Sequence, residues 1–102
     1  FTGRILNGEQ AKEVGLVTRV ANDPLAAAME LAEEIVGKNP DAVRAGKALY
    51  EQAWHADART GLELEAALQA QLIGTANQIE AVKANFEKRA PAFQPATRTE
   101  QG

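Results

Sequence analysis

Apolar residues recur along most of the chain at the three- and four-residue spacing of amphipathic helices. Between Asp23 and Gly37, Leu25, Ala28, Met29 and Ala32 follow this spacing, and Leu64, Leu68 and Leu72 repeat it at intervals of four. The same pattern covers the stretches Asn39–Trp54, Thr60–Gly74 and Thr75 toward Pro91. The pattern therefore predicts four helices after residue 22.

Start and stop residues support these helices. Asp23 and Asn39 each precede a proline, which combines an N-cap with a first-turn proline. Capping boxes are expected where Thr60 is followed by Glu63 and where Thr75 is followed by Gln78. Glycine ends the first and third of these helices, and Pro91 and Pro95 are expected to stop the last. The stops are Gly37, Gly74, Pro91 and Pro95.

The first 22 residues have a different character. Asn7 and Gln10 form a capping box for a short helix, which Gly15 closes in the left-handed conformation. Residues 16–20 then predict a short β-strand. A lone strand cannot satisfy its own backbone groups, so we expect it to pair with a sheet outside this sequence or with another copy. We divide the chain into residues 1–22, a helical region at 23–94 and a mobile tail at 95–102.

Composition excludes several classes of function. The 102 residues carry a net charge of −3, which disfavours nonspecific nucleic-acid binding. The chain has no cysteine and no serine, so disulfides, thiolate chemistry and a serine nucleophile are excluded. No apolar run reaches the ~18 residues of a membrane span, and a cytoplasmic location is expected.

Few side chains suggest chemistry. His55 is the only histidine, so neither a zinc site nor any other metal site is expected. Glu63 and Glu65 point to different sides of a helix, and we expect no catalytic residue in this chain. The last helix carries a denser group, and two interpretations stay open for it. Its cations complement the helix dipole while Phe86 packs in a core, or the group forms an anion-binding edge beside an aromatic surface. The group comprises Lys83, Phe86, Glu87, Lys88 and Arg89.

Several short motifs occur in an order that resembles one family. They are Thr2-Gly3, Ala11, Gly15-Leu16-Val17, Val20, Asn39-Pro40 with Lys47, Glu65, and Glu87-Lys88-Arg89 with Pro91 and Phe93. Together they resemble the C-terminal part of the enoyl-CoA hydratase/isomerase (crotonase) superfamily. The resemblance implies a mostly α fold class: the C-terminal helical region of a crotonase-like α/β spiral fold, with one short strand left from the core. In that family these helices form trimer contacts, within a trimer or a dimer of trimers, and cover the acyl-CoA site.

The resemblance also implies a function for the parent protein, most directly the hydration of a trans-2-enoyl-CoA. Hydratases of this family use two backbone N–H groups as an oxyanion hole and two glutamates as acid and base. We expect these elements upstream of Phe1, so the chain alone should be inactive. Coenzyme A is the substrate's carrier and no further cofactor is implied.

The family pattern places Lys88 near the CoA nucleotide, with Phe86 beside it as a second substrate-binding residue. Two departures concern the same site: Asn85 and Gln69 stand where family members often have aromatic residues. The alternatives are an enoyl-CoA isomerase, another crotonase-superfamily enzyme, or a noncatalytic helical interaction module.

Overall fold

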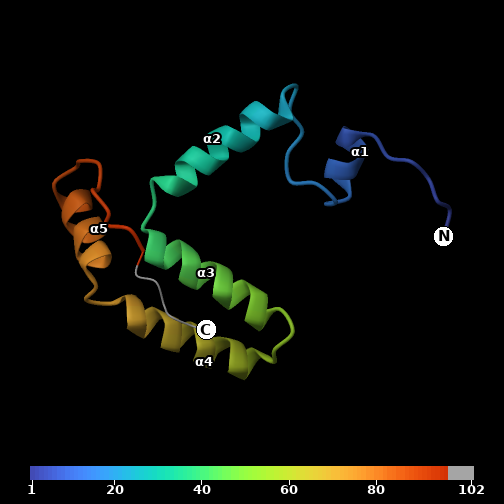
Figure 1. Ribbon diagram of the computed structural model, residues 1–102. Helices are drawn as coiled ribbons and strands as arrows, with labels where there is room; N and C mark the ends of the chain where they lie inside the picture. The colour runs from blue at the N-terminus through green and yellow to red at the C-terminus, as the bar shows by residue number, and fades with distance from the viewer. Residues whose placement is uncertain (97–102) are drawn as a thin grey trace. The chain divides into compact units, whose positions relative to one another are not determined.

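The computed structural model describes residues 1–96, and within them the secondary structure is entirely helical. Contacts between residues divide the chain into two compact units, Phe1–Glu33 and the residues from Glu34 onward. A mobile tail is predicted at residues 95–102, and residues 97–102 of it lie outside the described residues. Figure 1 shows the helices, which are α1 (Gly8–Glu13), α2 (Pro24–Val36), α3 (Pro40–Ala53), α4 (Ala58–Leu72) and α5 (Ala76–Phe86).

Helix α1 begins and ends as the sequence predicts. The Asn7 side chain accepts from the Gln10 N–H at 2.9 Å, and the Gln10 side chain accepts from the Asn7 N–H at 3.1 Å. At the other end Gly15 has a φ of 75°, and its N–H donates to the Lys12 carbonyl. The capping box and the left-handed glycine therefore define this short helix.

The strand predicted at residues 16–20 is wrong for the part of the chain that the structure describes. The N–H groups of Leu16 and Val17 donate instead to the Ala11 carbonyl, at 2.8 and 3.4 Å, and so close the end of α1. The Val20 side chain lies against Gly8, where an added Cβ would stand 3.3 Å from a Val20 methyl group. A strand is stabilised by a hydrogen-bonded neighbour, and residues 1–96 supply none, so the local helix-ending bonds prevail.

Helices α2 and α3 both begin at an Asx-proline pair. The Asp23 carboxylate accepts from the Ala26 N–H at 3.0 Å, and the Asn39 amide oxygen accepts from the Asp41 N–H at 3.0 Å. Each proline occupies the first helical position, where its missing N–H costs nothing. Both helix starts confirm the prediction.

Helix α4 begins three residues earlier than predicted. Asp57 is its N-cap and accepts from the Thr60 N–H at 2.8 Å, which lowers the pKa of the Asp57 carboxyl below its ordinary value. The Glu63 carboxylate accepts a hydrogen bond from Arg59 Nε at 2.8 Å. The predicted Thr60 capping box is therefore wrong, because aspartate is the stronger N-cap and Ala58 extends the helix readily.

Helices α3 and α4 form an antiparallel hairpin and lie side by side (Figure 1). Their contact covers only some of the apolar side chains of α3. Gly46 and Leu49 face α4, whereas Tyr50 and Trp54 are 74% and 81% exposed.

Buried apolar side chains are few. Among the described residues only Ala11 and Ala84 are apolar and buried, and large apolar side chains of α2, α3, α4 and α5 are open to solvent. Apolar exposure on this scale is unusual for a soluble monomer. No helix within residues 1–96 combines the length and the hydropathy that crossing a membrane requires.

Candidate functional site

The residues predicted to bind substrate stand where the chain reverses after α5. The helix begins at Thr75, whose hydroxyl accepts from the Gln78 N–H at 3.3 Å, and ends at Phe86. The Lys88 N–H donates to the Asn85 carbonyl at 3.3 Å, and the Arg89 N–H donates to the Ala84 carbonyl at 3.0 Å. These two bonds are those of a Schellman motif.

Lys88 occupies the left-handed position of this motif, with a φ of 52°. Glycine is the usual residue there, because a Cβ is disfavoured in this conformation. The prediction that Pro91 and Pro95 stop the helix is therefore wrong. The helix ends at the Schellman motif, before either proline is reached.

Arg89 is held by two carboxylates. It makes a bidentate pair with Glu80, at 2.5 Å for Nη1–Oε1 and 3.0 Å for Nη2–Oε2, and its Nε donates to Glu87 at 2.6 Å. Glu80 also accepts the Ala92 N–H at 2.8 Å. The hydrogen bonds from Arg89 and then from Ala92 lower the pKa of Glu80 to about 2, and Glu80 and Glu87 raise the pKa of Arg89.

A buried amide fastens the segment that follows. Asn77 is 4% exposed, and its Oδ1 accepts from the Gln94 N–H at 2.8 Å while its Nδ2 donates to the Gln94 carbonyl at 3.1 Å. The same Nδ2 donates to Asp41 at the start of α3, at 2.7 Å. Glu80 and Asn77 thus hold residues 89–94 along α5 and connect them to α3.

The two predicted binding residues lie close together on this reversal. Phe86 is 81% exposed, so the interpretation that it packs in a core of this chain is not supported by the described residues. Within residues 1–96 the Lys88 ammonium makes no ion pair, whereas Glu87 and Arg89 are paired with one another. Lys88 and Phe86 are both exposed and lie two positions apart in the chain, and a cation and an aromatic ring suit a ligand that carries both phosphate and an aromatic group. Contact of Lys88 and Phe86 with CoA stays a prediction.

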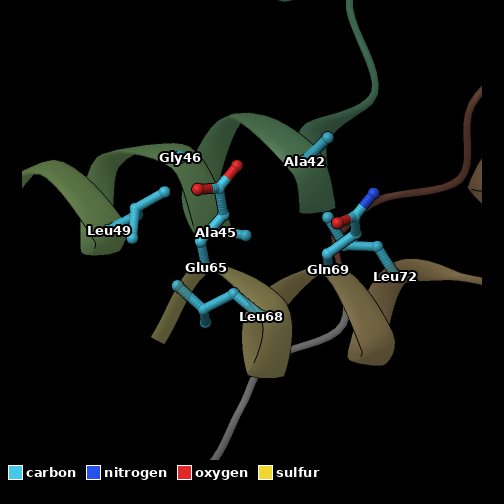
Figure 2. A pocket seen from close by; sticks show the side chains of 8 residues that line it. All are labelled: Ala42, Ala45, Gly46, Leu49, Glu65, Leu68, Gln69 and Leu72. Carbon is cyan, nitrogen blue, oxygen red and sulfur yellow. The ribbon is translucent and has the colours of Figure 1, made fainter. Parts of the chain in front are cut away.

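A concave region lies between α3 and α4. It is an open groove of about 220 Å³, in which the side chains of Glu65 and Gln69 reach from α4 toward α3 (Figure 2). Glu65 belongs to the family pattern and Gln69 is one of the two departures from it, and the two residues lie one helical turn apart on the same wall. The groove is lined by Ala42, Ala45, Gly46, Leu49, Glu65, Leu68, Gln69 and Leu72.

The remaining polar residues singled out in the sequence do not converge on a site. Lys47 pairs with Glu51 at 3.8 Å on exposed surface. His55 is exposed at the end of α3. No cluster of three or more His, Asp or Glu side chains in the described part of the chain could hold a metal ion.

Sequence reasoning missed Glu80 and Asn77, the two side chains that organise the reversal. Both lie on α5 and act on residues nine or more positions later in the chain. A helix-spacing pattern contains no information on such partners.

Comparison with known proteins finds relatives along nearly the whole chain. The family model described as enoyl-CoA hydratase/isomerase matches residues 1–96. The mouse enoyl-CoA hydratase domain-containing protein 2, a mitochondrial protein, is 40% identical over 99 residues, which cover 91% of this chain and 33% of the relative. Mouse mitochondrial methylglutaconyl-CoA hydratase is 35% identical over 99 residues, covering 91% and 32%.

A solved structure gives the same result for the fold. The enoyl-CoA hydratase from Bacillus anthracis superposes with a TM-score of 0.85 at 36% identity, over 90% of this chain and 36% of that protein. The chain spans about a third of the length of the curated relatives it matches. The chain therefore belongs to the enoyl-CoA hydratase/isomerase (crotonase) family, and its helices form a segment of the crotonase fold.

Proposed function

We propose that this chain is the C-terminal helical part of an acyl-CoA enzyme whose reaction is the hydration of a trans-2-enoyl-CoA. The observation that carries the proposal is the family match over residues 1–96, together with relatives named as enoyl-CoA hydratase and methylglutaconyl-CoA hydratase. The oxyanion hole and the acid–base glutamates then belong to the part of the enzyme outside this sequence. The 102-residue chain itself contributes binding and assembly surfaces, and no catalytic residue.

Two features of the structure support a role in binding. Lys88 is a cation without an ion pair in the described region, and the exposed Phe86 lies two positions before it in the chain. CoA offers three phosphate groups and an adenine ring, which match these two side chains in kind. We assign the nucleotide end of the acyl-CoA to this pair.

The exposed apolar faces support a role in assembly. Leu62, Ile79, Val82 and Phe86 are among the large apolar side chains open to solvent on α4 and α5. We propose that such faces pack on the rest of the enzyme and on neighbouring subunits, in a trimer or a dimer of trimers.

Two further assignments belong to the proposal. Double-bond isomerisation is the second candidate reaction, because a relative from Mycosarcoma maydis that is 35% identical is named an enoyl-CoA isomerase/hydratase. The compartment stays a prediction: the lack of cysteine is compatible with the cytoplasm, whereas the two mouse relatives are named mitochondrial.

The in-frame coding sequence upstream of Phe1 tests the proposal against a noncatalytic helical module. We expect a further stretch of about the length of one typical domain, containing Gly-rich turns and two glutamates. A start codon directly before Phe1 would contradict the enzyme assignment and favour the interaction module.

A further inference from the structure

Of the three charged residues in the Glu87-Lys88-Arg89 motif, Glu87 and Arg89 form ion pairs within residues 1–96 and Lys88 does not. The carboxylate of Glu87 accepts from Arg89, and Arg89 also makes its bidentate pair with Glu80. The Lys88 ammonium has no ion pair in the described residues. The motif is therefore arranged around Lys88, with its two neighbours fixed in place.

Glu80 is the residue that fixes them. Its carboxylate binds the Arg89 guanidinium and the Ala92 N–H, so it closes a loop from the middle of α5 to the far side of the reversal. Its side chain is only 20% exposed and that of Arg89 is 38% exposed, so water competes less for this pair than for the other ion pairs of the helices. We propose that Glu80 is a positioning residue for the CoA nucleotide, which holds the chain reversal so that Lys88 can reach a phosphate group.

The backbone of Lys88 explains why such a clamp is needed. A lysine in the left-handed conformation is held there by surrounding bonds, since an unrestrained chain populates that region sparsely. If the reversal were loose, ordering it would be part of the binding process and would weaken affinity. The clamp acts on a group far from the reacting double bond, so its loss should raise KM and leave kcat nearly unchanged.

The test is Glu80→Gln in the full-length enzyme, and it rests on the proposed contact between Lys88 and CoA. Glutamine keeps the size but presents an N–H group to the guanidinium and cannot make the bidentate pair. We expect KM for an acyl-CoA to rise about threefold to tenfold, which is bounded by the roughly tenfold value of one cation–phosphate contact. Hydration of the matching acyl-pantetheine, which lacks the nucleotide, should not change.

Matched variants accompany this experiment. Glu63→Gln removes a carboxylate–arginine pair of similar length on α4 and should leave KM unchanged. Arg89→Lys keeps the charge, loses the bidentate geometry and should raise KM in the same manner as Glu80→Gln. Arg89→Lys also supplies the test if Glu80→Gln fails to fold.

The outcomes separate the inference from the proposed function. If Lys88→Ala leaves KM for acyl-CoA unchanged, the proposed CoA contact is wrong and the positioning role with it. If Lys88→Ala raises KM and Glu80→Gln does not, only the positioning role is overturned. A Glu80→Gln effect that disappears in the Lys88→Ala background supports it, because the two residues then act on one contact. Additive effects, or an equal effect on acyl-pantetheine, overturn it.

Discussion

Replacing Lys88 with glycine should leave the protein more stable than replacing it with alanine, although both variants lose the same charge. Lys88 has a φ of 52°, in the left-handed region. A residue with a Cβ costs roughly 1–2 kcal/mol in that conformation, and glycine avoids this cost. Glycine also loses more backbone freedom on folding, and this entropy cost offsets about 0.4–1 kcal/mol of the stabilisation. The free energy of unfolding of Lys88→Gly should therefore exceed that of Lys88→Ala by about 0.5–1 kcal/mol.

Urea unfolding followed by far-ultraviolet circular dichroism measures this difference in two variants that differ at one Cβ. The matched control is the pair Asn85→Gly and Asn85→Ala, because residue 85 lies inside α5. There glycine should be the less stable of the two by about 0.5–1 kcal/mol, the opposite sign. If Lys88→Gly is as stable as Lys88→Ala or less stable, the Schellman assignment at this position is refuted.

Four further outcomes follow from the structure. Asp57→Ala should lower the free energy of unfolding by about 1 kcal/mol in a urea titration, and Thr60→Ala should lower it less, because Asp57 and not Thr60 is the N-cap of α4; equal losses would contradict this. The depressed pKa of Glu80, about 2 against an ordinary 4.5, gives stability that is present above about pH 4.5 and is lost as the pH falls toward 2, and Glu80→Gln should remove that dependence from acid-unfolding curves. Asn77→Ala should cost about 1–3 kcal/mol in thermal unfolding, because it leaves the N–H and carbonyl of Gln94 without their partner. The chain alone should self-associate through its exposed apolar faces, and a strict monomer in sedimentation at high micromolar concentration would argue against that.

A helix start could be predicted from the sequence wherever one capping residue stands directly before the helical pattern. Asn7, Asp23, Asn39 and Thr75 cap the helices that follow them, as their local patterns indicate. The cap of α4 was misplaced because the Thr60 pattern satisfies the same rule as Asp57. When two capping residues lie within one turn, local pattern alone cannot choose between them, and side-chain strength as an acceptor decides.

The prediction of a strand at residues 16–20 is wrong because strand formation depends on a partner that the local sequence does not reveal. Leu16-Val17-Thr18-Arg19-Val20 is β-branched and apolar, but a strand exists only where a neighbouring backbone pairs with it. The N–H groups of Leu16 and Val17 are taken by α1 in the described chain. The residue types of this segment favour a strand, but the described chain offers no neighbouring strand to pair with it.

The predicted substrate residues were found from the motif, and the residues that hold them were not. Lys88 and Phe86 are identified by their place in a family pattern, which requires no knowledge of contacts. Glu80 and Asn77 act on residues that return to α5 only after the chain reverses, so their roles depend on the three-dimensional path. That path is set by the left-handed conformation at Lys88, which its residue type does not predict.

Hydration of crotonyl-CoA tests whether this chain is the noncatalytic part of an acyl-CoA enzyme. The assay follows the loss of the conjugated thioester absorbance when purified protein is added, first with the 102-residue chain alone and then with the full-length enzyme. We expect no protein-dependent rate for the chain alone and a rate for the full-length enzyme that saturates with acyl-CoA. A rate from the chain alone that survives repurification, or a full-length protein that binds no acyl-CoA, would contradict it.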